Sequence, residues 1–135
     1  MVMFVVMRYL GLDIGNRHTG IAYLDSSVGI PLPLDTLHHA SETQLVDAVL
    51  AIVRERRVEA ILVGLPRLPS GEEGAQAIQS RKVGTLLSSA GVTVKYVDER
   101  YTTPRSSQHK NALPTQNIDG DATAACALLS QKLDH

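Results

Sequence analysis

Apolar residues along the chain form short runs separated by polar turns, a pattern typical of alternating strands and helices. Four runs rich in Val, Leu and Ile are predicted to be strands: residues 3–14, 20–24, 60–64 and 92–97. The first two flank a turn at Gly15-Asn16, so we expect them to pair antiparallel. Residues 30–37 are expected to form an edge strand at most, because Pro31 and Pro33 lack the N–H group that a sheet ladder needs.

Between the predicted strands, apolar residues recur at helical spacing. Ser41 and Gln44 have the spacing of a capping box, which predicts a helix ending near residues 56–57. A second helix is expected to end at Gly91, and a third to span residues 121–133. The residues expected to face the core are Leu45, Val49, Ile52 and Val53 in the first helix, Val83, Leu86, Leu87 and Ala90 in the second, and Ala122, Ala125, Cys126, Leu129 and Leu133 in the third.

The order of these elements predicts an α/β domain with a mixed five-stranded sheet flanked by helices on both faces. Thr103-Pro104 indicates one further helix start, because proline is favoured at the first helical position. The length of 135 residues suits a single domain, residues 1–135, and 44% hydrophobic residues are enough for a real core.

Composition and charge narrow the classes of function. The single cysteine excludes an intramolecular disulfide, and with five scattered histidines it gives no zinc-finger spacing. The net charge is −1, so any nucleic-acid binding must use a local basic patch. The apolar start is too short to cross a bilayer and lacks the features of a signal peptide. We therefore expect a cytoplasmic protein without a membrane partner.

Four carboxylates lie at the ends of predicted elements: Asp13, Asp98, Glu99 and Asp121. Taken singly, each could form a turn, end a strand in solvent or cap a helix. The carboxyl ends of the strands would bring these side chains together. The repulsion between two carboxylates about 5 Å apart would then cost about 3 kcal/mol at an effective dielectric of about 20. A bound cation, or protonation of one carboxylate, would relieve that repulsion. Because oxygen ligands suit Mg²⁺ and Mn²⁺, the residues predict a divalent-metal site and phosphoryl chemistry.

Four motifs, in the same order along the chain, resemble those of the YqgF family. This family is also called RuvX and consists of small bacterial homologues of the RuvC Holliday-junction resolvase. Residues 13–22 (DIGNRHTGIA) resemble its D-x-G-x-[KR]-x-x-G-x-A opening, and residues 63–74 (VGLPRLPSGEEG) its V-G-L-P-x-x-x-x-G loop. Residues 98–103 (DERYTT) are similar to D-E-R-x-[ST]-T, and residues 121–125 (DATAA) to D-x-x-A-A.

The resemblance implies an RNase H-like fold and a metal-dependent endonuclease that hydrolyses phosphodiester bonds. It implies that Asp13, Glu99 and Asp121 are the catalytic metal ligands for Mg²⁺ or Mn²⁺. Asp13 would bridge two ions, a bound water would be the nucleophile, and Asp98 would help the neighbouring turn. The expected partner is pre-16S rRNA, whose 5′ end the family is associated with processing, or Holliday-junction DNA. A monomer or a homodimer is compatible with the sequence, and junction resolution favours a symmetric dimer.

Four basic residues are candidates for binding nucleic acid: Arg17, Arg100, Arg105 and Lys110. Arg17 lies in the turn after the first strand and either contacts a phosphate or is a solvated turn residue. Arg100 either binds phosphate or fixes Glu99. Arg105 and Lys110 lie in a stretch without carboxylates, which is either the required basic patch or a polar loop.

The remaining residues leave two competing functions open. The D-x-G turn also resembles the first phosphate motif of actin-like and sugar-kinase ATPases, although those enclose the nucleotide between two domains. A non-catalytic nucleic-acid binding factor with a vestigial acidic site is the other alternative, although a pure binder gains nothing from acids near phosphate. Asp119 could be a fourth metal ligand or a helix cap, Cys126 is expected in the core, and His38-His39 is expected to have no partner at metal-ligand spacing.

Overall fold

The computed structural model describes residues 6–99 and 120–133 of the chain. Its elements follow the order β1 (Arg8–Ile14), β2 (His18–Asp25), β3 (Leu32–Pro33), β4 (Leu37–His38), α1 (Glu42–Arg56), β5 (Ala60–Pro66), α2 (Ala75–Ser89), β6 (Thr93–Glu99) and α4 (Gly120–Leu133). The helix start predicted at Thr103-Pro104 lies outside the described residues. Among the helices that the structure describes, none has the length and apolar character needed to span a membrane.

The described strands form one mixed six-stranded sheet in the order β3-β2-β1-β5-β6, with β4 also paired to β2. β1 is antiparallel to β2 and parallel to β5, which is in turn parallel to β6. The mixed sheet is confirmed, but the predicted count of five strands is wrong. Because Pro31 and Pro33 cannot donate to a ladder, the edge segment pairs only in two short pieces, β3 and β4.

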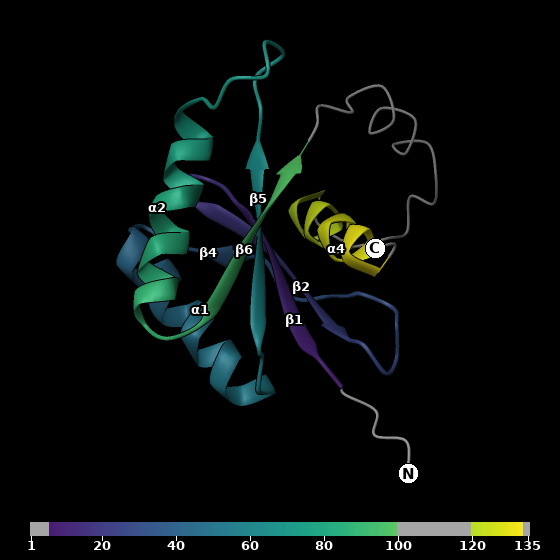
Figure 1. Cartoon of the computed structure of the whole chain (residues 1–135). Coiled ribbons are helices and arrows are strands. Elements are labelled where there is room, and N and C mark those ends of the chain that lie inside the picture. The colour runs from purple at the N-terminus through teal and green to yellow at the C-terminus, as the bar shows by residue number, and fades with distance from the viewer. Residues whose placement is uncertain (1–5, 100–119, 134–135) are drawn as a thin grey trace.

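Helices cover both faces of the sheet, as predicted: α1 and α2 lie on one side and α4 on the other (Figure 1). The α1/α2 face holds the larger buried cluster, made of Leu10, Leu12, Ile14, Ile21, Leu45, Val49, Val58, Ile61, Val63, Val83 and Leu87. The α4 face holds a smaller one, made of Ala22, Leu24, Leu62, Ala125 and Leu129. Successive strand residues point to opposite faces, so β1 sends Leu10, Leu12 and Ile14 to the first cluster.

Three strand boundaries differ from the sequence prediction. β1 begins at Arg8, and residues 6 and 7 precede it, whereas a start near residue 3 was expected. β2 is longer at both ends than residues 20–24. β6 ends at Glu99 and not at residue 97, because its last two residues pair with Leu65 and Pro66 of β5.

The start of α1 follows the capping prediction with one difference. Ser41 Oγ accepts a hydrogen bond from the Gln44 amide at 3.1 Å, as a capping box requires. Gln44 Oε1 reaches back to the amide of Ala40 at 2.8 Å, one residue earlier than in the standard motif. The helix ends at Arg56 and is capped by Arg57, whose φ of 55° is left-handed. Leu45 and Val49 are buried and Ile52 and Val53 pack beside them, as predicted.

The buried face of α2 is partly different from the predicted one. Its buried residues are Ala77, Ser80, Val83, Gly84 and Leu87. Leu86 is 42% exposed and Ala90 is exposed, so their assignment to the core is wrong. Val83, Gly84 and Leu87 lie three, four and seven positions after Ser80, so these buried residues form one row along the helix. Leu86 lies beside this row and not in it.

In α4, the structure confirms most of the predicted core. Ala125 and Leu129 are buried and Cys126 is half-buried against them, while Leu128 is an additional buried residue. The side chains of Ala122 and Leu133 lie outside the described set. Burial raises the pKa of the Cys126 thiol, which suits a core residue rather than a reactive one.

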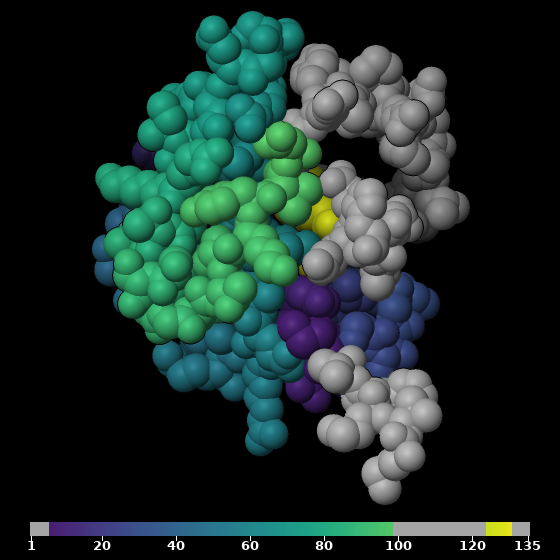
Figure 2. All heavy atoms as spheres, in the orientation of Figure 1, coloured from purple at the N-terminus to yellow at the C-terminus, as the bar shows by residue number. Residues whose placement is uncertain are grey.

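A close approach between β1 and α4 depends on Gly11. A Cβ atom at this position would lie 2.7 Å from the Ala125 carbonyl oxygen and 3.1 Å from Leu129 Cγ. The helix therefore rests directly on the strand backbone. On the other face, α2 and β6 adjoin in one continuous surface (Figure 2), where Tyr96 Oη donates to the Arg81 carbonyl oxygen at 3.4 Å.

Candidate active site

Asp13 lies at the carboxyl end of β1, beside Gly20 of β2 in the antiparallel ladder. Its side chain is half-buried. Gly11, two residues earlier, lies against α4, so strand alternation puts Asp13 on the α4 face as well. The next residue anchors this strand end, because the carbonyl of Ile14 accepts a hydrogen bond from Gln76 Nε2 of α2 at 3.1 Å.

Glu99 is the last residue of β6 and pairs with Pro66 of β5. Because β1, β5 and β6 are parallel, the carboxyl ends of β1 and β6 lie at the same edge of the sheet. Val97 packs in the α4-face cluster, so alternation assigns position 99 to that face too. Positions 13 and 99 therefore share one face and one edge.

Asp121 is the second residue of α4, one helical turn before Ala125, whose carbonyl lies against Gly11. The helix that carries it covers the face to which Asp13 belongs. The side chains of Glu99 and Asp121 lie outside the described set. Within the described part of the chain, no group of three or more histidine, cysteine or carboxylate side chains is arranged to hold a metal ion.

Asp98 has a different role from the predicted turn residue. It lies inside β6 and accepts from Arg67 Nη2 at 2.9 Å, on the face opposite position 99. Arg67 also pairs with Glu73 at 3.3 Å, and Glu73 receives two bonds from Arg81 at 2.7 and 2.8 Å. The Arg81 guanidinium holds the pKa of Glu73 below its usual range. This ion-pair chain ties the end of β6 to the β5–α2 loop.

Of the predicted nucleic-acid ligands, the structure describes only Arg17. It lies in the β1–β2 turn and is exposed, while its carbonyl accepts from the His39 amide at 3.0 Å. Arg100, Arg105 and Lys110 lie outside the described residues, as does Asp119.

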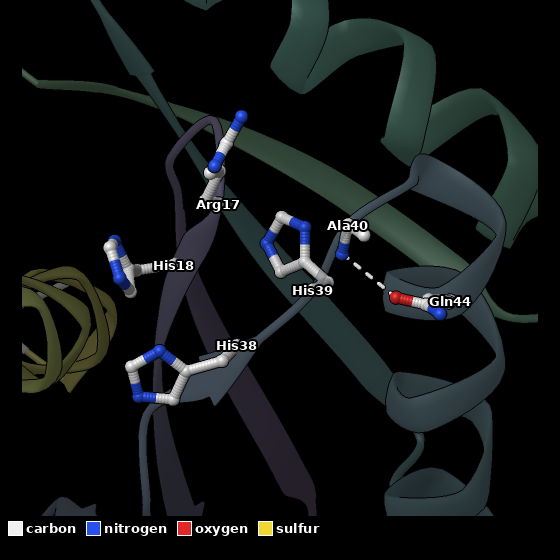
Figure 3. Close-up of a pocket in the computed structure, with 6 residues that line it drawn as sticks. All are labelled: Arg17, His18, His38, His39, Ala40 and Gln44. Carbon is white, nitrogen blue, oxygen red and sulfur yellow. Dashed lines mark hydrogen bonds between the residues drawn. The ribbon is translucent and has the colours of Figure 1, made fainter.

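Three histidines lie near Arg17, and their grouping there was not predicted from the sequence. His18 of β2 and His38 of β4 are directly paired across the ladder, with ring centroids 4.7 Å apart, a contact that was not predicted from the sequence. His39 lies on the other side of the strand, toward α1 (Figure 3), where its Nε2 is 2.8 Å from Thr19 Oγ1. Burial and the two neighbouring imidazoles lower the pKa of His39, which favours its neutral form. Only the strand register, which the sequence does not display, brings these residues together.

A model of the RuvX family, described as Holliday junction resolvase, matches residues 7–135. The chain belongs to the RuvX family. A protein of Anaeromyxobacter sp. named "Putative pre-16S rRNA nuclease" is 35% identical to it over 133 residues, covering 95% of this chain and 97% of the relative. A Synechococcus sp. protein of the same name is 37% identical over 131 residues, covering 93% and 87%.

Solved RuvC structures have the same fold as this RuvX chain. Thermus thermophilus RuvC superposes with a TM-score of 0.63 at 14% identity, covering 94% of both chains. The same protein in complex with a Holliday junction gives 0.62 at 16% identity, covering 94% and 93%. The RNase H-like fold is therefore confirmed. Family membership and full-length nuclease relatives make the RuvX chain an enzyme that hydrolyses phosphodiester bonds.

Proposed function

We propose that this RuvX chain is a divalent-metal-dependent endonuclease that processes the 5′ end of pre-16S rRNA in the cytoplasm. The observation that carries the site is the common face and edge of positions 13 and 99, beneath the helix that bears Asp121. The names of the relatives from Anaeromyxobacter and Synechococcus favour the RNA substrate. The family's description favours a second candidate, Holliday-junction DNA.

The donor chemistry of the proposed site suits a divalent metal. RuvC-like nucleases depend on such ions in general. Asp13, Glu99 and Asp121 offer only carboxylate oxygens, the ligands that Mg²⁺ and Mn²⁺ prefer. Asp13 is half-buried at the strand end, where water screens its charge less than at an open surface. When bound, the ions would activate a water and stabilise the leaving oxygen.

The chain's own residues bind and orient the substrate in this proposal. Asp13 would hold both ions, and Glu99 and Asp121 would each hold one. Arg17 is four residues from Asp13 in the exposed turn and donates to a phosphate oxygen near the cut bond. The stretch with Arg100, Arg105 and Lys110 supplies further contacts to the backbone of the nucleic acid.

A cleavage assay tests the proposal directly. A labelled 16S-precursor 5′ leader and a four-way DNA junction are offered in the same run, with Mg²⁺, Mn²⁺ or a chelator. The wild type is compared with Asp13→Asn and with a control, Asp47→Asn, which removes an exposed carboxylate from α1. We expect metal-dependent cutting by the wild type and the control and none by Asp13→Asn.

The other outcomes separate the alternatives. Preferred cutting of the junction selects resolution, which requires a symmetric dimer detectable by light scattering. Cutting that survives Asp13→Asn refutes the site. Binding that is independent of metal, without cleavage of either substrate, identifies a non-catalytic binding factor.

A further inference from the structure

A cluster of imidazole and guanidinium groups lies beside the proposed site, at the β4 edge of the sheet. His18 and His38 meet edge to face, with their ring planes at 88°. They open into a pocket of about 490 Å³. The pocket is lined by Arg17, His18, His38, His39, Ala40 and Gln44. Figure 3 shows the His18 and His38 rings on the side of the strands toward α4, with Arg17 at the turn above them.

The donor groups of this pocket are available to a ligand. Arg17, His18 and His38 are all exposed. Within residues 6–99 and 120–133, these two imidazoles and the guanidinium have no side-chain hydrogen bond or ion pair with the protein. Their only ring contact in that part of the chain is the one between the two imidazoles. An imidazole carries at least one N–H donor in either protonation state, and a guanidinium carries five.

The charge of the pocket selects an anion. Its lining contains one guanidinium and three imidazoles but no carboxylate. His39 has a structural task, because its ring bonds Thr19 Oγ1 and its amide bonds the Arg17 carbonyl. These bonds hold the segment that carries His38 against the turn that carries Arg17. The two remaining imidazoles and the guanidinium are left to face solvent.

The position of the pocket indicates which anion it takes. Asp13 pairs with Gly20, and His18 lies two residues from Gly20 on the same strand and the same face. Such diagonal neighbours lie roughly 7–8 Å apart in an antiparallel pair. A nucleic-acid strand carries a phosphate about every 3.4 Å of helix axis. A strand held at Asp13 therefore brings further phosphates to the pocket.

We propose that His18 and His38, together with Arg17, form a phosphate-binding subsite for the nucleic-acid backbone, a few nucleotides from the bond that is cut. The subsite's place next to the cut bond rests on the proposed nuclease function, but its binding of phosphate does not. A transition-metal site fits less well, because no three histidine, cysteine or carboxylate side chains of the described residues are arranged to hold one ion.

Binding without catalysis tests the subsite. Fluorescence anisotropy with labelled leader RNA and labelled junction DNA is measured in chelator, on an Asp13→Asn background. We expect His18→Gln with His38→Gln to raise the Kd at least about fivefold, the effect of losing one or two charge-assisted contacts. Arg54→Ala is the control, because Arg54 is an exposed cation in the last turn of α1. His38→Arg should restore binding, since it returns a donor and a positive charge.

Neutral methylphosphonate groups, placed one at a time along the oligonucleotide, locate the contact. We expect one or two positions at which neutralisation weakens binding of the parent protein but not of the double glutamine variant. Weakening at the same positions in both proteins overturns the proposal, as does an unchanged Kd in the double variant. If the Kd values for RNA and for DNA change alike, the subsite contacts the phosphate and not the sugar.

Inorganic phosphate keeps this test separate from the nuclease assay. In a phosphate titration followed by NMR, the imidazole signals of His18 and His38 should move while the signal of His39 stays fixed. Phosphate shifts without cleavage refute the nuclease and retain the subsite. Cleavage with an unchanged Kd in the double variant, and with no phosphate shifts, refutes the subsite alone.

Discussion

The two faces of the sheet are built from the same strands but carry different kinds of residue. On the α1/α2 face, Leu10, Leu12 and Ile14 of β1 enter an apolar cluster between the sheet and helices α1 and α2. On the α4 face, the alternate residues of β1 lead from Tyr9, packed in a small cluster, through Gly11 to the carboxylate Asp13. Core residues and the proposed metal ligand therefore alternate along β1. A substitution at Leu12 should lower stability, and one at Asp13 should lower activity.

The same contrast appears in β6. Asp98 faces α2 and is held by Arg67, whereas position 99 belongs to the α4 face. The α1/α2 side thus fixes the strand ends, and the other side presents the residues proposed to act. A rigid packed face of this kind would let the opposite face collect the like charges of the proposed site at one edge.

The largest effect on stability should come from Leu12→Ala. Leu12 is fully buried between strands and helices, so we expect the free energy of unfolding to fall by about 2–5 kcal/mol. Urea denaturation measures the change. Leu68→Ala, at a leucine that is 49% exposed, is the control and should cost less than about 1 kcal/mol. Equal losses at the two positions would contradict the assignment of Leu12 to the main core.

Gly11→Ala should be next, because it pushes α4 away from the sheet. The new Cβ would meet a backbone carbonyl that cannot rotate away, so we expect a loss of about 1–3 kcal/mol in urea denaturation. Gly84→Ala is the matched change on the other face. There the new Cβ meets the Tyr96 side chain, which is 38% exposed and able to turn outward, while the helix gains an alanine. A larger loss at Gly84 than at Gly11 would refute the close docking of α4.

Arg67→Met should affect catalysis more than stability. Its ion pairs are partly exposed, so we expect the free energy of unfolding to change by less than about 1 kcal/mol. Releasing Asp98 loosens the end of β6, so kcat for leader cleavage should fall severalfold while KM changes little. Lys82→Met, which breaks an exposed pair with Glu42, is the control and should leave kcat unchanged. An unchanged kcat in Arg67→Met would remove this ion-pair chain from the support of the site.

The smallest expected effect is on the way the free energy of unfolding depends on pH. Burial and the nearby imidazoles lower the pKa of His39 in the folded state, so the unfolded state binds more protons below its own pKa of about 6.5. The free energy of unfolding should therefore fall as the pH drops through about 6.5 toward the folded pKa. His39→Asn should flatten this dependence in urea denaturation at a series of pH values. A slope that is identical in the variant would show that other groups cause the acid sensitivity.

Local patterns predicted the parts of the fold that local interactions decide. The Ser41 cap, the buried run of β5 and the antiparallel pair β1–β2 follow from residues adjacent in the chain. Non-local pairing decided the rest. β6 extends to Glu99 because β5 offers hydrogen-bonding partners up to Pro66. Leu86 is exposed because the neighbouring elements cover a different row of α2 side chains.

The site divides in the same way. Motif spacing singled out Asp13, Glu99 and Asp121 without any structure, and their roles stay predictions. The pairing of His18 with His38 was missed because it depends on the register of a two-residue strand, twenty positions away along the chain. Pro31 and Pro33 made the segment before α1 a weak strand candidate. Its last part nevertheless pairs with β2 as β4, which brings His38 to the pocket.

The most direct test of the two-face account measures activity and stability of Asp13→Asn together. Asparagine keeps the size and the acceptor oxygen of the aspartate but lacks the charge needed to hold a divalent ion. We predict that metal-dependent cleavage of the leader RNA is lost, while the free energy of unfolding of the metal-free protein stays within about 1 kcal/mol of the wild type. Retained cleavage, or a loss of stability comparable to that of Leu12→Ala, would contradict the claim that Asp13 serves chemistry rather than the core.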